Sequence, residues 1–356
     1  MKIAVAMSGG LDSSMAALLL KEAGHEIIGI TAELSAGIIA RHYGTPAAPG
    51  AVESARAVAD AHGIPLHVVN LEDDFQSLIV EPFCNEYLRG ATPNPCVRCN
   101  ALIKFGRLLD RARSLGCEAI ATGHYALIRH SAAGRYYVAR GKETAKDQSY
   151  FLYRITQESL ESIMFPLGGF TKEEVRRMAL ERRLPVAERP ESQEICFIPD
   201  NRYDEFIGRA AGRVPEPGDI VDTGGAVIGR HRGIHRYTIG QRRGLAIAAP
   251  RPLYVVHIDA DRNAIVAGYR EDLETTSLFA GAIHFMKETA LDGKRALVKT
   301  RSTQPPVPAL LVEESGGVTV RFDEPQIGIS PGQAAVFYND EIEVLGGGTI
   351  LQGFKS

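Results

Sequence analysis

Strands and helices alternate along the first two hundred residues, and this alternation limits the chain to a small set of folds. Apolar β-type runs are expected at 2–7, 26–31, 66–70 and 117–122, separated by helical patterns at 13–23, 52–62, 75–88 and 96–114. Strands that alternate with helices form a parallel sheet with helices on its faces. We therefore predict an α/β fold that binds its ligands at the carboxyl ends of the strands.

The hydrophobic pattern of the chain changes from helical to β-type after about residue 205. Before that point, two strands are expected in YALIRH and RYYVAR, and a helix in 171–185, where Thr171 and Glu174 are spaced as a capping box and Pro185 as the stop. Beyond it, short β-type runs such as RALVKTR and AAVFY alternate with Gly, Pro and Asp. We predict an α/β domain at 1–205, a small, mostly β, Arg-rich module at 206–275 and a C-terminal β-barrel at 276–356.

Composition narrows the class of protein. No apolar run approaches the roughly 18 residues that a membrane helix needs, and Asp12 comes before any signal-type apolar core develops. Five cysteines, an odd number, argue for free thiols, metal binding or catalysis rather than a disulfide framework. We expect a cytoplasmic protein without membrane contact, and a monomer by default.

The run AVIGRHRGIHRYTIGQRRGL (226–245) concentrates positive charge. It holds five arginines, among them Arg236 and Arg242, and no acidic residue, although the whole chain has a formal net charge of −3. Such a run neutralises phosphates, whereas arginines in a solvated loop are usually diluted with Asp or Glu. We predict contact with phosphate or RNA.

The stretch VAMSGGLDSS (5–14) forms the turn between the first strand and the first helix. Its glycines leave room for a phosphate at the helix N-terminus, and Ser8, Ser13 and Ser14 add hydroxyl donors. The usual P-loop is absent, because no lysine occurs between Lys2 and Lys21. Asp12 is available to hold Mg²⁺ on the phosphates. A tight turn is the alternative interpretation, but the string resembles the signature of PP-loop (N-type) ATP pyrophosphatases.

A second informative stretch, GATPNPCVRCNALIKFG (90–106), places Cys96 and Cys99 at the start of a helix. Asn94 can cap this helix and Pro95 fits its first position. A helix N-terminus, together with Arg98 and Lys104, favours the thiolate. The CxxC spacing suits redox chemistry, a metal half-site or a catalytic thiol, whereas a structural zinc site would need a second pair.

The remaining cysteines lie in different contexts. Cys84 and Cys117 lie amid apolar residues and are expected to be buried. Cys196 follows Glu191 and Glu194, whose charges would raise its pKa. Local sequence leaves open whether Cys196 is structural or functional.

Eight short stretches, the last of them near the C-terminus, can be compared with the motifs of known families in their order along the chain. They are AMSGGLDSS, TPNPCVRCNALIKFG, ATGHYA, KDQSYFL, FPLGGFTKEEVR, SQEICFIP, HRGIHRYTIGQRRGL and PGQAAVFY (331–338). Together they resemble the bacterial tRNA-specific 2-thiouridylases, the MnmA family, over almost the whole chain. Members of this family use ATP to replace the C2 oxygen of the anticodon wobble uridine with sulfur.

The resemblance implies a tRNA-uridine 2-sulfurtransferase whose catalytic residues are Cys99, Cys196 and Asp12. Cys196 would carry sulfur as a persulfide, and Cys99 would be its partner thiol. Domain 1–205 would bind ATP and Mg²⁺, and the later domains would bind tRNA. The implied ATP-binding residues are Ala6, Met7, Ser8, Gly9, Gly10, Leu11, Asp12, Ser13, Ala32 and Gly123.

The family also implies how RNA and sulfur would reach the site. The partners would be tRNA, read at the anticodon, and a sulfur donor, either a cysteine desulfurase or a sulfur-relay protein. The target base would meet Asn94, Pro95 and Cys96. The tRNA-contacting positions would be His124, Lys146, Asp147, Gln148, Arg301, Ser302 and Gln333, with Arg236 and Arg242 of the central module.

Three departures from the family pattern bear on these roles. Cys96 stands where some members have an acidic residue, Ala32 replaces a methionine in a segment (33–50) without the usual acidic loop, and Ser302 replaces a tyrosine. Because Cys96, Cys99 and Cys196 could supply three thiolates, a [4Fe-4S] cluster that delivers the sulfur is an alternative to the persulfide. Another PP-loop synthetase and a non-catalytic RNA-binding protein are further alternatives.

Overall fold

A computed structural model describes residues 1–35, 37–39, 50–184, 195–198, 202–211 and 216–355. The predictions that concern Pro185, Glu191 and Glu194 lie outside these ranges. The chain forms two compact units. Unit 1 consists of Met1–Ile79, Cys96–Asn201 and Ile342–Leu345, and unit 2 of Val80–Pro95, Arg202–Glu341 and Gly346–Ser356.

Unit 1 is built on a five-stranded sheet in which every strand pair is parallel. Its spatial order is β3 (Leu66–Asn70), β2 (Glu26–Glu33), β1 (Lys2–Ala6), β4 (Ala119–Ala121) and β7 (Ile163–Met164). The central strand β1 is short and apolar, and Ile3, Ala4 and Val5 have no exposed surface. Strands buried on both faces are typical of a parallel sheet covered by helices, and the predicted α/β fold is confirmed.

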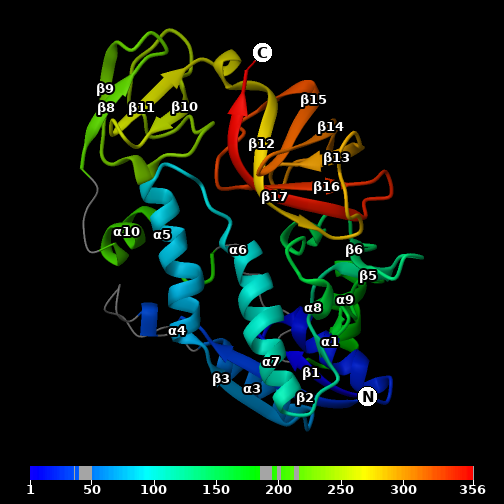
Figure 1. The fold of residues 1–356 in the computed structure, drawn as a ribbon. Coiled ribbons are helices and arrows are strands. Elements are labelled where there is room, and N and C mark those ends of the chain that lie inside the picture. Colours follow the sequence, from blue (N-terminus) through cyan, green and yellow to red (C-terminus); the bar gives the residue numbers. More distant parts are fainter. Residues whose placement is uncertain (36, 40–49, 185–194, 199–201, 212–215, 356) are drawn as a thin grey trace. The chain divides into compact units, whose positions relative to one another are not determined.

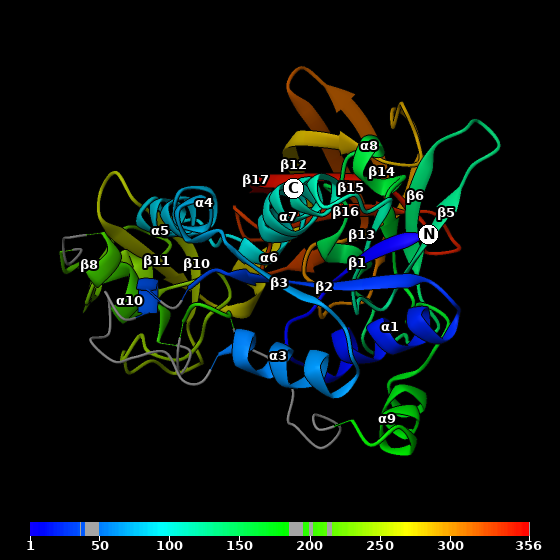
Figure 2. The same cartoon turned by 90° about the horizontal axis from the view of Figure 1, so that it is seen from below.

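Helices cover both faces of this sheet. Figure 2 shows α1 (Leu11–Glu22) and α3 (Ala51–Ala61) on one face, and α7 (Leu108–Ser114) on the other, where it packs against β1, β2 and β4. Ala16 and Ala17 of α1 are fully buried and let the helix approach β1 closely. The other regular elements of unit 1 are α4 (Glu72–Phe75), α8 (Gln157–Leu160), α9 (Lys172–Glu181), the 3₁₀ turn Ser149–Phe151 and the hairpin β5 (Ala126–His130) with β6 (Tyr136–Arg140).

Two helices differ from their predicted form. The helix predicted at 75–88 begins at Glu72, becomes π-helical over Gln76–Val80 and continues as α5 (Glu81–Leu88). The helix predicted from Cys96 begins at Pro95 as α6 (Pro95–Arg98), is π-helical over Cys99–Arg107 and ends as α7. A 3.6-residue hydrophobic period does not reveal a π-helical segment, a feature frequent at functional sites. Cys99 is the first residue of the second segment.

The capping box predicted for α9 is confirmed. Thr171 Oγ1 accepts a hydrogen bond from the Glu174 backbone N at 3.2 Å, and Glu174 Oε2 accepts one from the Thr171 N at 2.7 Å. Together they satisfy two backbone donors at the helix N-terminus. The helix therefore begins at Lys172, whose side chain emerges from its first turn.

Unit 2 contains a four-stranded sheet and a barrel (Figure 1). The sheet has the order β10 (Tyr254–Asp259), β11 (Ala264–Gly268), β8 (Gly218–Val221) and β9 (Val227–His231), with Ile220, Val255 and Ile265 in its core. The helical elements of unit 2 are α5, α10 (Tyr203–Ala210), and 3₁₀ turns at Ile234–Arg236 and Arg270–Leu273.

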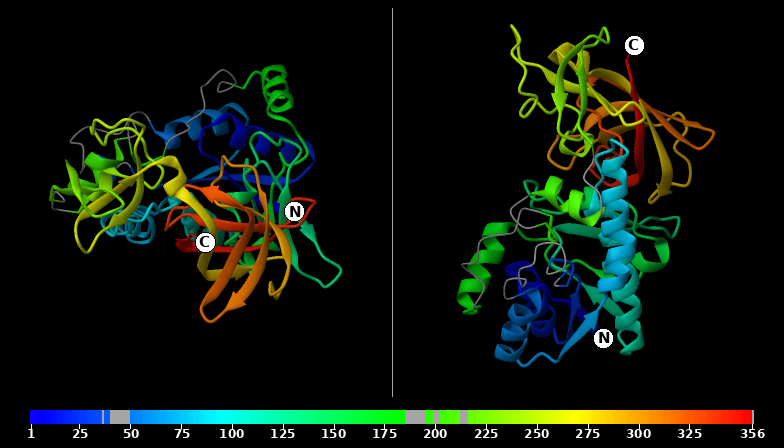
Figure 3. Two further views of the ribbon diagram at one scale, coloured as in Figure 1. Left: turned by 90° about the horizontal axis from the view of Figure 1, so that it is seen from above. Right: turned by 90° about the vertical axis from the view of Figure 1, so that its left-hand side faces the viewer.

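The C-terminal strands close into a six-stranded antiparallel barrel, as predicted (Figure 3). Around the barrel the strands are β12 (Glu274–Phe285), β15 (Gly317–Ile327), β14 (Val307–Glu314), β13 (Arg295–Lys299), β16 (Ala334–Tyr338) and β17 (Val344–Phe354). Among the described residues, no helix is long and apolar enough to cross a membrane. The three-domain boundaries stay a prediction.

Candidate active site

The loops that follow β1 and β4 meet at the centre of the parallel sheet. The chain continues from β1 to β2 and β3 on one side, whereas β4 lies on the other side of β1, so this is the switch point at which α/β sheets bind ligands. A Cβ at Gly123 would lie 2.6 Å from the Asp12 carbonyl carbon and 2.7 Å from the Ser13 N. Gly123 therefore lies against the first turn of α1. Its contact with a nucleotide stays a prediction.

Hydroxyl groups hold the SGGLDSS loop in shape. Ser13 Oγ accepts a hydrogen bond from the Ser8 N at 3.1 Å and donates to the Gly10 carbonyl at 3.2 Å. Ser14 Oγ donates to the same carbonyl at 2.8 Å. Gly9 adopts a φ of 70°, which a residue with a Cβ rarely adopts. The hydroxyls of Ser13 and Ser14, which we expected to donate to a phosphate, therefore donate to the Gly10 carbonyl within the loop.

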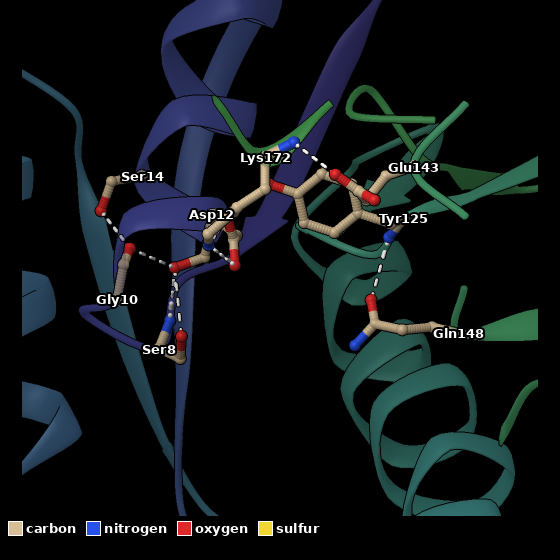
Figure 4. Close-up of polar contacts among 9 residues, drawn as sticks. Ser8, Gly10, Asp12, Ser14, Tyr125, Glu143, Gln148 and Lys172 are labelled. Atoms are coloured by element: carbon tan, nitrogen blue, oxygen red, sulfur yellow. Dashed lines mark hydrogen bonds and ion pairs between the residues drawn. The ribbon is translucent and has the colours of Figure 1, made fainter. Parts of the chain in front are cut away.

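The carboxylate of Asp12 is held by two side chains from distant parts of unit 1 (Figure 4). Lys172 Nζ lies 2.7 and 2.8 Å from its two oxygens, and the Tyr125 hydroxyl donates to Oδ1 at 2.8 Å. The Lys172 side chain is 9% exposed and that of Asp12 32%. Lys172 Nζ also lies 5.7 Å from the centroid of the Tyr125 ring, a cation–π distance.

Sequence reasoning missed both partners of Asp12. Lys172 lies 160 residues from Asp12 and supplies, from α9, a cation that the loop itself lacks. Its backbone N donates to Glu143 Oε2 at 3.0 Å, which fixes the start of α9 beside the loop (Figure 4). The capping box around Thr171 was the one available signal, since it identified Lys172 as a first-turn residue.

The three thiols singled out in the sequence interact within unit 1. The charges of Cys99 and Cys96 both raise the pKa of Cys196, and that of Cys96 raises the pKa of Cys99. Cys96 and Cys196 have exposed surface and Cys99 is partly buried. The fold therefore brings Cys196 near a CxxC pair almost a hundred residues earlier. By contrast, Cys84 and Cys117 are buried, as predicted.

All five cysteines are free thiols, and the predicted thiolate character of the CxxC pair is wrong for this structure. Desolvation by the surrounding protein raises the pKa of Cys99 to about 11 and that of Cys196 to about 12, and it also raises the pKa of Cys96. The ammonium of Lys104 lowers all three pKa values, as expected, but by less than burial raises them. Burial thus outweighs the positive charge.

His124, a predicted RNA contact, is buried. The residue is 7% exposed, and its ring packs against Phe105 and Phe165 and places Nδ1 2.6 Å from Thr122 Oγ1. Burial, and secondarily Lys104, hold the pKa of His124 well below its usual value, so the ring is neutral at pH 7. A contact between this ring and RNA would require its surroundings to open.

The neighbouring segment Lys146–Gln148 is bonded to the backbone of unit 1. Asp147 Oδ1 accepts a hydrogen bond from the Ser149 N at 3.0 Å, and Gln148 Oε1 accepts one from the Tyr125 N at 2.9 Å. Gln148 therefore contacts Tyr125, whose hydroxyl donates to Asp12. Its RNA contacts stay a prediction.

Unit 2 holds the other predicted RNA contacts. Gln333 Nε2 donates to the carbonyls of Thr92 and Pro93 at 2.8 and 3.5 Å, and so anchors the segment that leads to Asn94 and Pro95. Arg301 donates to the carbonyls of Gly328 and Ile239 at 2.7 and 3.1 Å. These two side chains therefore have structural bonds within unit 2.

The positive residues of the central module differ in their surroundings. Arg236 forms an ion pair with Asp204 at 2.8 Å, whereas Arg242 is exposed and lines a surface depression with residues 245–253. Ser302 is partly exposed. Exposed arginine beside an open depression is compatible with a phosphate contact, which stays a prediction.

The side chains that could bind Mg²⁺ or a [4Fe-4S] cluster can now be examined in the structure. Among residues whose placement the structure describes, no three His, Cys, Asp or Glu side chains are arranged to hold a metal ion. A [4Fe-4S] cluster on Cys96, Cys99 and Cys196 stays an alternative prediction, because its thiolates bind different iron atoms and lie further apart than the ligands of one ion. Mg²⁺ bound to nucleotide phosphates keeps several waters and needs only one or two carboxylates, and Asp12, whose side chain is 32% exposed beside Lys172, can supply one.

A glycine- and serine-rich loop at the switch point of a parallel sheet, followed by β-domains, defines the class of PP-loop ATP-binding proteins with appended barrels. Three family models match in this order: a tRNA methyl transferase HUP domain over residues 1–200, a tRNA methyl transferase PRC-barrel domain over 204–269 and an aminomethyltransferase β-barrel domain over 275–350. The chain belongs to the tRNA-specific 2-thiouridylase (MnmA) family.

Relatives that match this chain over nearly their whole length support the family assignment. The protein named tRNA-specific 2-thiouridylase MnmA from Geobacter metallireducens is 47% identical over 98% of this chain and 96% of its own length. Its namesake from Geotalea uraniireducens is 48% identical over 98% and 94%, and that from Moorella thermoacetica 47% identical over 97% and 98%. The similarity spans both units.

Proposed function

We propose that this chain is a tRNA-uridine 2-sulfurtransferase, which uses ATP to replace the C2 oxygen of the wobble uridine with sulfur. The relatives named for this activity support the assignment. The observation that carries it is that one compact unit holds both the ATP-type loop around Asp12 and the interacting thiols Cys99 and Cys196. Activation of a carbonyl and delivery of sulfur need both.

In the first step, the C2 oxygen of uridine attacks the α-phosphorus of ATP and pyrophosphate leaves. The backbone of Gly9 and Gly10 at the N-terminus of α1 would bind the phosphates. Lys172 would neutralise charge on the departing pyrophosphate, and Asp12 would hold Mg²⁺, which stabilises that charge as a Lewis acid. The remaining implied ATP contacts, including Ala32 and Gly123, belong to this proposal.

In the second step, the terminal sulfur of a Cys196 persulfide attacks C2, and AMP leaves. Cys99 then attacks Cys196 Sγ, the sulfur–sulfur bond breaks, and the sulfur remains on the base while a Cys99–Cys196 disulfide forms. Alternatively, Cys99 attacks first and releases sulfide, which is then the nucleophile. Either route ends with Cys99 and Cys196 oxidised to a disulfide. An external thiol reductant must therefore supply two electrons to restore both cysteines. A persulfide ionises near neutral pH, so the raised pKa of the Cys196 thiol does not block the step.

The partners follow from the same scheme. We propose that tRNA is read at the anticodon, that a cysteine desulfurase or sulfur-relay protein loads Cys196, and that the monomer is the working form. The base must leave its stack to reach the site, and Asn94, Pro95 and Cys96 would receive it. The domain boundaries at 205/206 and 275/276 belong to this proposal as well.

The test is anaerobic purification, iron and labile-sulfide analysis, and an ATP-dependent thiolation assay on unmodified tRNA. Cys96→Ala, Cys99→Ala and Cys196→Ala are compared with Cys117→Ala, which removes a buried thiol elsewhere in unit 1. The persulfide route predicts no iron, and activity that needs Cys99 and Cys196 but not Cys96. If the wild type contains iron, and if all three variants lose both iron and activity, the persulfide route is wrong and the cluster route replaces it. Pyrophosphate release that does not need Cys99 and Cys196, without thiolation, would favour another synthetase.

A further inference from the structure

The buried phenol of Tyr125 has no role in the steps above, yet it touches their carboxylate. Tyr125 is 2% exposed, and its hydroxyl donates to Asp12 Oδ1 at 2.8 Å (Figure 4). Lys172 Nζ binds both Asp12 oxygens and lies over the same ring. Lys172 holds the carboxylate by its charge on both oxygens, and the phenol adds a directional hydrogen bond to one of them.

The backbone of Tyr125 is tied to the segment Lys146–Gln148. Gln148 Oε1 accepts a hydrogen bond from the Tyr125 N at 2.9 Å, and the Gln148 N donates to the Tyr125 carbonyl at 3.3 Å. Glu143, three residues before Lys146, accepts a hydrogen bond from the Lys172 backbone N through Oε2. Figure 4 shows Tyr125 between Gln148 and Asp12. A displacement of Gln148 would therefore be transmitted to the phenol.

We propose that Tyr125 is a positioning residue that orients the Asp12 carboxylate for pyrophosphate release and links that orientation to the position of Gln148. This inference rests on the proposed function, because that function requires tRNA, and the family resemblance implies tRNA contacts at Lys146, Asp147 and Gln148. RNA bound at the segment fixes Gln148, Gln148 fixes the Tyr125 backbone, and the phenol fixes Asp12. ATP is then cleaved fastest when RNA is in place.

The first experiment compares Tyr125→Phe with Tyr137→Phe. Tyr137 is also buried and donates its hydroxyl to a carboxylate, Glu343 Oε1, at 2.9 Å, so each variant loses one phenol–carboxylate bond. We expect similar falls in melting temperature. Pyrophosphate release with saturating ATP and unmodified tRNA should have a kcat about 10–100-fold lower in Tyr125→Phe only. The Kd of ATP, measured by calorimetry, should stay within about twofold of wild type in both variants.

Several outcomes would overturn the inference. They are a wild-type kcat in Tyr125→Phe, an equal loss of kcat in Tyr137→Phe, and a loss confined to ATP affinity. If the wild type itself releases no pyrophosphate, the proposed function fails and the inference fails with it. Wild-type release without an effect of Tyr125→Phe removes the inference alone.

The link to the RNA segment has its own test. Gln148→Leu removes the acceptor for the Tyr125 N, whereas Gln148→Glu keeps an oxygen there. We expect Gln148→Leu to lower kcat about as much as Tyr125→Phe and Gln148→Glu to recover most of it, even if both raise the KM for tRNA. Equal kcat values in the two variants would refute the link.

Discussion

Lys172 and Asp12 form an ion pair that joins the first turn of α9 to the first turn of α1, with distances of 2.7 and 2.8 Å from Nζ to the two carboxylate oxygens. The pair is largely buried, which strengthens its electrostatic interaction relative to an exposed pair. It places a positive charge beside a phosphate-type loop that has no lysine of its own.

Lys172→Ala should therefore slow pyrophosphate release with ATP and tRNA by about 10²–10³-fold, because the departing charge loses its ammonium. Arg182→Ala is the matched control. Arg182 pairs with Glu22 at 2.7 Å, and so also joins α9 to α1, at the other end of both helices. Equal rates in the two variants would contradict a role of Lys172 in the reaction.

Gly123→Ala should abolish ATP binding. Its Cβ would lie within 2.8 Å of three Asp12 and Ser13 atoms, two of them backbone atoms, so the loop would have to move. Gly169→Ala is the control, since a Cβ there meets no atom within 4 Å. Calorimetric titration with ATP should show binding in wild type and Gly169→Ala only, with all three proteins folded by circular dichroism.

The Cys196 thiol should react slowly despite its exposed surface. With its pKa raised to about 12 by desolvation, the thiolate fraction at pH 7.5 is on the order of 10³-fold below that of a simple thiol. Because a raised pKa favours the protonated form, the rate should rise about tenfold per pH unit up to pH 10. Iodoacetamide labelling followed by mass spectrometry of the Cys196 peptide measures it, with unfolded protein as the reference. Fast labelling of the folded chain at pH 7.5 would show a thiolate.

Stability should fall as the pH drops below about 6.5. Burial lowers the pKa of His124, His231 and His235, so the unfolded chain binds these protons first. The contribution is complete above the unfolded pKa and is lost as pH falls, by at most about 1.4 kcal/mol per pH unit for each histidine. Urea unfolding between pH 7.5 and 5.5 checks this. His124→Gln should reduce the slope, whereas His257→Gln, at an exposed position, should leave it unchanged.

Local patterns were sufficient to predict the parallel sheet, the barrel and most element positions. Lys2–Ala6, for example, is a short apolar run followed by a Gly- and Ser-rich turn, and such a run is visible in any short window. The capping box of Thr171 and Glu174 is likewise a four-residue signal. The π-helical segment that begins at Cys99 was missed, because no short-range residue pattern distinguishes it from an α-helix.

What the sequence by itself determined was the chemistry available: a phosphate-type loop with Asp12, a CxxC pair, a third thiol at Cys196 and an arginine-rich module. Only the tertiary structure decided which groups meet. It brought Lys172 and Tyr125 to Asp12, brought Cys196 to Cys99, and surrounded the thiols with enough protein that desolvation outweighs the charge of Lys104. The physical reason is that hydrogen bonds, ion pairs and desolvation depend on distance in space, whereas a sequence motif records only separation along the chain.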